Sequence, residues 1–180
     1  MVPLYSRQIV VDIDILRAAG DSLKVDLRSN ACRKFLISIL DICHRVVISE
    51  ALIEEWERNR ARFASRWLNQ MFGHKKIETI EQIENMVIRK KIQKYCVDKN
   101  IRNIILKDFH LCETALKSDS IIASMDDSVR KHLSILSKQV HEIGDIIWVN
   151  PENPEEGTLT WLQNGAKYEK SRTLGYSGKS

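Results

Sequence analysis

Short runs of apolar, mostly β-branched residues recur along the chain, separated by longer segments with helical spacing. Each run has the composition of a strand that is covered on both faces of a sheet. We predict four such strands, at residues 8–16 (QIVVDIDIL), 45–48, 121–123 and 146–149. Because strands that alternate with helices form parallel sheets covered on both faces, the pattern predicts an α/β protein with three α/β/α layers and a central, mostly parallel sheet.

The segments between these strands carry apolar residues every three or four positions, which predicts amphipathic helices. We expect helices over residues 26–42, 50–72, 73–98, 108–116 and 129–140. The long helix that ends at Gly73 and the helical region after it add extra helices to the middle of the chain. Residues 1–150 form the expected domain. Residues 151–180 are expected to be a C-terminal tail, partly docked around Trp161 and Leu162 or flexible, with a frayed end over residues 175–180.

Composition limits the function classes. The chain has 180 residues and a net charge of +4, which suits one mildly basic globular domain. The four cysteines have no CxxC spacing and form no cluster with histidine, so neither a zinc site nor a disulfide framework is indicated. There is no signal-peptide core near the N-terminus and no apolar run of about 20 residues. We therefore expect a cytoplasmic protein without membrane contacts.

Aspartates stand at the ends of predicted strands and at the start of a predicted helix. Asp12 and Asp14 lie within the 8–16 run, at or just past the end of its strand, Asp126 follows the 121–123 strand, and Asp108 opens the 108–116 helix. Asp108 and Asp126 are also explained as helix N-caps. Asp12 is the least cap-like, because two acids in a buried strand repel each other and are costly to desolvate. Asp14 is expected on the same strand face, where it supports or replaces Asp12.

The carboxyl ends of parallel strands meet at one edge of a sheet, where ligands bind. We expect Asp12, Asp108 and Asp126 to gather there, joined by Glu55 from the helix after the second strand. Crowded carboxylates cannot all ionise unless a cation lies among them. Ligands that are all oxygen favour Mg2+ or Mn2+.

The helix at residues 50–72 leaves two alternatives open. Glu54 and Glu55 compete for the acidic role, and each is also explained by an ion pair with Arg58. Basic residues on this helix and the next predict a surface for a nucleic-acid phosphate backbone, with a merely solvated face as the alternative. This basic set comprises Arg58, Arg62, Arg66, Lys90 and Lys91.

Four segments, in order, resemble the motifs of the PIN domain, a metal-dependent ribonuclease fold. They are VVDIDIL (10–16), VVISEALIEEW (46–56), DFHLCETAL (108–116) and IIASMDDSV (121–129), and the match spans residues 8–150. The resemblance implies a catalytic set of Asp12, Glu55, Asp108 and Asp126, in which the three aspartates bind Mg2+ or Mn2+. The additional acids Asp14, Glu54 and Asp127 leave the ligand set open, and Ser124 is expected to support it by hydrogen bonding.

The resemblance further implies an endoribonuclease that hydrolyses single-stranded or structured RNA. Many small bacterial members resemble toxins that are neutralised by an antitoxin and often dimerise. The expected partners are therefore RNA, an antitoxin or other protein, and a second copy of the chain.

Two other functions compete with the nuclease. A haloacid-dehalogenase-like phosphatase would use Asp12 as nucleophile, Asp14 as general acid and Lys107 as phosphate partner, with Ser49 at the end of the second strand. A catalytically inactive PIN-like module would instead bind RNA or hold a partner protein.

Overall fold

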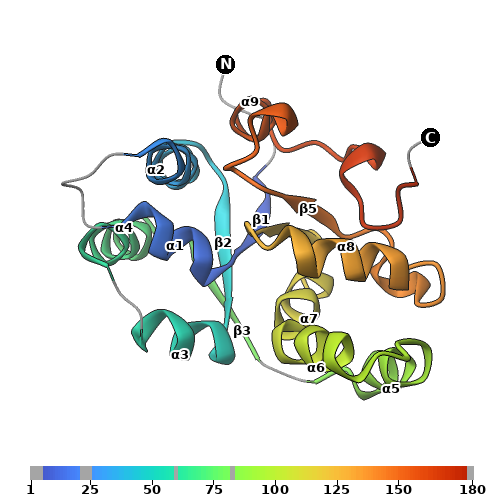
Figure 1. Cartoon of the computed structure of the whole chain (residues 1–180). Helices are drawn as coiled ribbons and strands as arrows, with labels where there is room; N and C mark the ends of the chain where they lie inside the picture. The colour runs from blue at the N-terminus through green and yellow to red at the C-terminus, as the bar shows by residue number, and fades with distance from the viewer. Residues whose placement is uncertain (1–5, 21–25, 59–60, 82–83, 178–180) are drawn as a thin grey trace.

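A parallel sheet of five strands forms the centre of the described part of the chain (Figure 1). The computed structural model describes residues 6–20, 26–58, 61–81 and 84–177. The strand order is β3-β2-β1-β4-β5, and each neighbouring pair is parallel. The strands are β1 (Gln8–Val11), β2 (Arg45–Ser49), β3 (Ile77–Ile80), β4 (Ile121–Ala123) and β5 (Ile147–Val149). The predicted α/β/α class with a parallel sheet is confirmed.

Helices cover both faces of this sheet. Helices α1, α2 and α4 contact one another on one side, whereas α7 packs against β1, β2 and β4 on the other (Figure 1). None of the helices in the described residues has the length and apolar character to cross a membrane. The α-helices are α1 (Ile13–Ala19), α2 (Leu27–Asp41), α3 (Glu50–Arg58), α4 (Arg62–Gly73), α5 (Met86–Tyr95), α6 (Lys99–Asp108), α7 (His110–Leu116), α8 (Asp127–Leu136) and α9 (Thr158–Gln163). The short 3-10 helices are η1 (His141–Ile143), η2 (Pro154–Glu156) and η3 (Lys170–Arg172).

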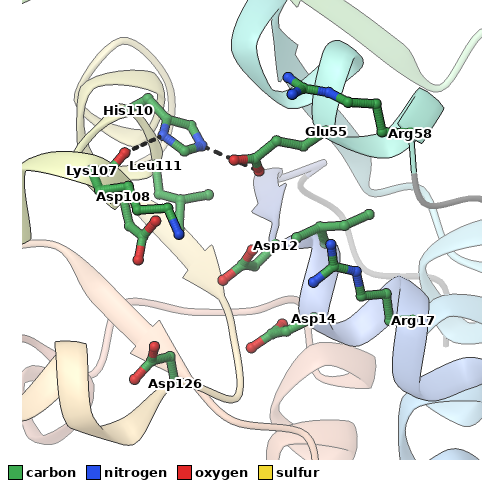
Figure 2. A pocket seen from close by; sticks show the side chains of 11 residues that line it. Asp12, Asp14, Arg17, Glu55, Arg58, Lys107, Asp108, His110, Leu111 and Asp126 are labelled. Carbon is green, nitrogen blue, oxygen red and sulfur yellow. Dashed lines mark hydrogen bonds and ion pairs between the residues drawn. The ribbon is translucent and has the colours of Figure 1, made fainter. Parts of the chain in front are cut away.

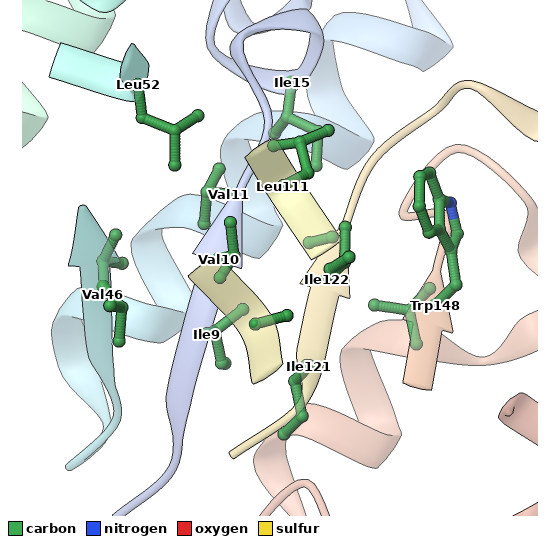
Figure 3. Packing of buried hydrophobic residues seen from close by; sticks show 14 of the residues in the cluster. Ile9, Val10, Val11, Ile15, Val46, Leu52, Leu111, Ile121, Ile122 and Trp148 are labelled. Carbon is green, nitrogen blue, oxygen red and sulfur yellow. The ribbon is translucent and has the colours of Figure 1, made fainter. Parts of the chain in front are cut away.

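Apolar side chains of the central strands fill both faces of the sheet (Figure 3). Ile9, Val10 and Val11 of β1 have no exposed surface, and Ile122 of β4 is equally buried. Val10 pairs in register with Ile122. Burial of β-branched residues on both faces of the pleat explains why these short runs form strands.

The first strand is shorter than predicted. It ends at Val11, and α1 begins directly after Asp12, which takes an extended conformation. Asp14 therefore lies in the first turn of a helix, and its predicted place on the same strand face as Asp12 was wrong. Over so few residues, an apolar pattern fits a buried strand and a buried helix equally well.

The predicted helix over residues 50–72 is two helices. After α3, the chain is extended at Ala61 (φ −77°, ψ 156°), and α4 begins at Arg62. Trp56 of α3 and Trp67 of α4 pack edge to face, with ring centroids 6.5 Å apart. Both helices are amphipathic, and the apolar positions of the two follow one helical pattern in the sequence, which is why a single helix was predicted. Residues 59–60 lie outside the described chain.

Strand β3 was predicted as helix, which was wrong. Ile77 and Ile80 have helical spacing, yet the segment pairs with β2, with Val46 opposite Ile77 and Ser49 opposite Ile80. An edge strand of this length forms because β2 offers a row of backbone partners, a tertiary cause that local pattern cannot show.

A buried ion pair fixes α5 to α7. Arg89 on α5 donates to both carboxylate oxygens of Glu113 on α7, at 2.8 Å from Nε and 2.7 Å from Nη2. The Asn85 backbone N–H also donates to Glu113, at 2.7 Å. Because only 3% of Glu113 is exposed, these charge-assisted bonds satisfy a carboxylate that water does not reach.

The C-terminal helix α9 packs against α2. Trp161 and Leu162 on α9 are buried. The buried His44 accepts the Arg7 N–H at Nδ1 (3.1 Å), and its Nε2 lies 2.9 Å from the Leu162 carbonyl oxygen. The ring must therefore be neutral with its proton on Nε2, which joins the chain before β1 to α9.

The chain after α9 continues along the outer strand β5. Thr173 forms an antiparallel bridge with Ile147, and the Leu174 N–H donates to the Ile146 carbonyl at 2.9 Å. The Gly175 N–H donates to the Gly144 carbonyl at 2.8 Å. The predicted tail is thus docked as far as these contacts reach; residues 178–180 of its predicted flexible end lie outside the described chain.

Candidate active site

A cavity of about 350 Å³ opens at the carboxyl ends of β1 and β4. The strand order reverses between these two strands, and such a switch point is where parallel α/β sheets bind ligands. The cavity walls come from the β1–α1 junction, α3, the α6–α7 junction and the β4–α8 turn (Figure 2). The lining residues are Asp12, Ile13, Asp14, Arg17, Glu55, Arg58, Lys107, Asp108, His110, Leu111 and Asp126.

All four acids of the predicted catalytic set line this one cavity, and so does Asp14. They come from segments up to more than a hundred residues apart in the chain. Figure 2 shows Asp12, Asp14, Asp108 and Asp126 around a common space. The geometric expectation that the parallel sheet gathers these carboxylates at one edge therefore holds for the described chain.

Ser124 links the acids at the centre of the site. It follows β4 directly and is fully buried. Its Oγ lies 2.8 Å from Asp12 Oδ2 and 3.1 Å from Asp14 Oδ2, and it accepts the Asp126 N–H at 3.1 Å. The backbone fixes the same junction, because the Asp12 N–H donates to the Ala123 carbonyl at 2.9 Å. The hydroxyl can donate its one proton to either carboxylate while it accepts from the start of α8, which is the hydrogen-bonding position expected for Ser124.

Asp12 and Asp14 are crowded and poorly solvated. Burial raises the pKa of Asp12 above its usual range, and the charges of Asp108 and Glu55 act in the same direction. Burial, and then the charge of Asp12, raise the pKa of Asp14 to about 7. Asp14 Oδ2 accepts the Met125 N–H at 2.7 Å, but its buried Oδ1 has no hydrogen-bond partner among the described residues. Such an arrangement is costly without a proton or a cation.

Asp108 and Asp126 differ in how they are held. Asp108 is the last residue of α6, with α7 starting after Phe109, so its predicted place as an N-cap was wrong. Burial raises the pKa of Asp108. Asp126 is an N-cap, because its Oδ1 accepts the Val129 N–H at 2.8 Å. Asp126 therefore both caps α8 and lines the cavity, and only its Oδ1 accepts the helix-capping bond.

Glu55, and not Glu54, faces the cavity. Glu54 points outward and pairs with Arg58 at 3.2 Å, as the i,i+4 alternative anticipated. Glu55 Oε2 lies 3.5 Å from His110 Nε2 (Figure 2). The hydrogen-bonding contact with His110 lowers the pKa of Glu55. Burial lowers the pKa of His110, but the Glu55 carboxylate outweighs burial and the net pKa is raised.

His110 was not among the predicted site residues. His110 is buried, with 8% of the residue exposed, and its Nδ1 lies 3.3 Å from the Lys107 carbonyl oxygen. The available signal was its position two residues after Asp108, inside a segment already singled out.

Asp127 was proposed as an additional acid but lies outside the cavity, where Asn150 donates to it at 2.9 Å.

The basic residues are distributed differently from the prediction. Of the predicted set, only Arg58 lines the cavity. Arg62 and Arg66 lie on α4 and Lys90 and Lys91 on α5, and these helices lie on opposite sides of the molecule (Figure 1). They therefore do not form one patch. Two cations that were not predicted as nucleic-acid contacts line the cavity instead: Arg17 and Lys107.

The donor chemistry of the cavity fits a hard divalent cation. Its ligands would be carboxylate oxygens, which Mg2+ and Mn2+ prefer, and the orphaned oxygen of Asp14 supplies a donor with no other task. In the described part of the chain, no three Asp, Glu, His or Cys side chains already lie close enough together to hold an ion. The carboxylates would therefore have to draw closer around it.

Comparisons with known proteins yield no family assignment: no protein-family model, no curated protein and no solved structure matches the chain. The PIN-domain resemblance accordingly stays a prediction based on the four motifs.

Proposed function

We propose that the protein is a PIN-like endoribonuclease that hydrolyses RNA phosphodiester bonds with the help of Mg2+ or Mn2+. One observation carries the proposal: Asp12, Asp14, Glu55, Asp108 and Asp126 line one cavity at the switch point of a parallel sheet. Crowding of this kind, with raised pKa values at Asp12, Asp14 and Asp108, is typical of functional sites rather than of helix capping.

Asp12, Asp108 and Asp126 would hold the cation, with Asp14 as a further ligand. When bound, a divalent cation neutralises the acids, polarises a phosphate oxygen and promotes ionisation of water. Ser124 donates a hydrogen bond toward Asp12 or Asp14 and so keeps their remaining oxygens turned to the cavity.

Glu55 and His110 supply the proton chemistry of the cavity. The lowered pKa of Glu55 keeps its carboxylate ionised, so it can orient a water and accept a proton from it. The raised pKa of His110 favours a protonated ring, which holds Glu55 in place and can stabilise negative charge on a phosphate. The 3.5 Å contact between Glu55 Oε2 and His110 Nε2 lets each side chain favour the charged form of the other.

Cleavage of fluorescent single-stranded RNA in Mg2+ or Mn2+ tests the proposal, and the chain offers two matched control pairs. Asp126→Asn and Glu55→Gln should lower kcat/KM by about a hundredfold or more, as the loss of groups that act on the reacting atoms does. Asp127→Asn and Glu54→Gln change neighbouring acids that lie outside the cavity and should keep most of the activity. EDTA should abolish cleavage by the wild-type protein.

A second readout does not require turnover. Mg2+ should raise the thermal midpoint of the wild-type protein, because an ion that binds only the folded state stabilises it. The shift should disappear in Asp12→Asn. Equal cleavage and equal Mg2+ stabilisation in the cavity variants and their controls would end the nuclease proposal. Matched single-stranded DNA decides whether the substrate is RNA alone.

A phosphatase is the second candidate, since Asp12, Asp14 and Lys107 line the same cavity and supply the nucleophile, acid and phosphate partner of a haloacid-dehalogenase-like site. Ser49 does not line the cavity, although that mechanism would place it there. Trapping of Asp12 by beryllofluoride, together with hydrolysis of phosphomonoesters but not of RNA, would favour the phosphatase.

The toxin role, with an antitoxin or a second copy of the chain as partner, is a further version of the nuclease proposal. Co-expression with a candidate partner would test it.

A further inference from the structure

Two cations of the cavity have no ion-pair partner among the described residues. Arg58 pairs with Glu54, Arg89 with Glu113, and Lys91 with Glu142. Arg17 and Lys107 form no such pair although five carboxylates line the same cavity. Their charges are thus held near an acidic site and left available for a ligand.

The two side chains approach the cavity from different walls. Arg17 stands in the last turn of α1, and Lys107 in the last turn of α6. Figure 2 shows them on opposite sides of Asp12, with Arg17 toward Asp14 and Lys107 toward Asp108. Both are exposed, so a ligand can reach them without movement of the backbone. The helix dipole favours a cation in the last turn of a helix. This effect explains why a basic residue is stable at each position, but not why both side chains reach the same cavity.

An acidic cavity alone would repel a polyanion. Its five carboxylates outnumber Arg17, Arg58 and Lys107, so an RNA strand needs positive charge on both sides of the point where its backbone meets the acids. Cations at the rim supply that charge, and phosphate contacts of this kind position a strand without reading its bases.

We propose that Arg17 and Lys107 bind the backbone phosphates on either side of the phosphodiester group that enters the acidic cavity. The inference rests on the proposed nuclease function and names its substrate class: a single-stranded polynucleotide engaged at an internal position, with phosphates both before and after the reacting one. The sequence predicted a broad phosphate-binding surface on α4 and α5; the proposed surface consists instead of two contacts at the cavity rim.

Binding of a short fluorescein-labelled single-stranded RNA, followed by anisotropy in buffer with Ca2+ at several salt concentrations, tests this proposal. The RNA is recovered after each titration and checked for intactness. Each lost phosphate contact should lower the slope of log K against log salt by about 0.7. We expect Arg17→Gln and Lys107→Gln each to weaken binding about tenfold, and the double variant to lose both contributions.

Arg17→Lys keeps the charge and should restore the salt slope, which separates a phosphate contact from a loss of folding. Arg66→Gln on α4 and Lys90→Gln on α5 are the matched controls, since both are exposed and lie outside the cavity. DNA of the same sequence should lose as much affinity as RNA in the Arg17 and Lys107 variants, because phosphates are common to both. Unchanged slopes in the double variant, or equal losses in the controls, would overturn the proposal.

The same measurements separate this inference from the nuclease function. If the wild-type protein cleaves no RNA in Mg2+ or Mn2+ but the slopes change as expected, the phosphate contacts stand and the nuclease proposal fails. If it cleaves RNA but the slopes do not change, the nuclease proposal stands and the role of Arg17 and Lys107 is refuted.

Discussion

Replacing Asp14 by asparagine should make the protein more stable and less active. The folded chain holds the Asp14 carboxylate beside Asp12, with one oxygen buried and unpartnered among the described residues. Asparagine has the same shape, can accept the Met125 N–H in the same way, and carries no charge. The substitution therefore removes a cost of folding and, at the same time, a ligand for the cation.

The magnitude follows from the pKa of Asp14. An ordinary aspartate titrates near 3.8, whereas burial and the charge of Asp12 raise the pKa of Asp14 to about 7. Between these values the folded chain retains a proton that the unfolded chain releases, so wild-type stability falls as pH rises. Each pKa unit corresponds to about 1.4 kcal/mol, so three units give about 4 kcal/mol at most. Because Asp12 competes for the same proton and some solvent contact remains, we expect a gain on the order of 2 kcal/mol above pH 7.

Urea denaturation between about pH 4 and pH 8 in EDTA, followed by circular dichroism, measures this difference in unfolding free energy. The advantage of Asp14→Asn should be largest above about pH 7 and should vanish near pH 4, where the side chain at position 14 is neutral in both folded proteins. Asp127→Asn, outside the cavity, should show no such gain. Mg2+ should stabilise the wild-type protein more than the variant.

If Asp14→Asn is no more stable than the wild-type protein at about pH 8, the Asp14 charge does not destabilise the fold. A gain that is the same at every pH would exclude the charge as its cause as well, since a constant gain would come from packing.

Three other substitutions test other features of the fold and the cavity. Glu113→Ala leaves Arg89 without its buried partner and should cost about 3–5 kcal/mol in urea unfolding; a loss below about 1 kcal/mol, as for a surface pair, would contradict this. Ser124→Ala removes a hydrogen bond that lowers the pKa of Asp12, so the acid limb of the pH profile for RNA cleavage should move to higher pH, and an unchanged profile would argue against the link. Burial lowers the pKa of His44 below 6.5, so wild-type stability should fall as pH drops below about 6.5, and His44→Gln should flatten that slope in urea titrations; equal slopes in both proteins would contradict it.

The sequence predicted those elements whose cause is local. Runs such as residues 121–123 are apolar throughout, too short for a helix and flanked by turn residues, which favours a strand of a covered sheet. Strand β3 depends instead on pairing with β2, and its two isoleucines have spacing that suits a helix. The break at Ala61 is similarly hidden, because the apolar faces of α3 and α4 meet through Trp56 and Trp67.

The candidate site was predicted to the extent that it depends on sheet topology. Asp12 and Asp126 follow neighbouring strands, so a parallel sheet must bring them to one edge. Whether a side chain faces inward depends on helix rotation, which separates Glu55 from Glu54 and leaves Asp127 outside. The cavity cations could not be predicted as a group, since Arg17 and Lys107 lie 90 residues apart and meet only through the packing of α1 and α6 around the sheet.

The course of the chain along β5 has a consequence for solubility. An outer strand exposes backbone groups that invite a strand from another molecule, and proteins commonly shield such edges. Here the chain shields its own edge, with Thr173 bridged to Ile147 and a hydrogen bond from Leu174. The fit leaves little room, since a methyl group added at Gly175 would lie 3.0 Å from the Gly144 oxygen. Loss of this segment would therefore open one side of the sheet to intermolecular pairing and favour aggregation, even with the cavity intact.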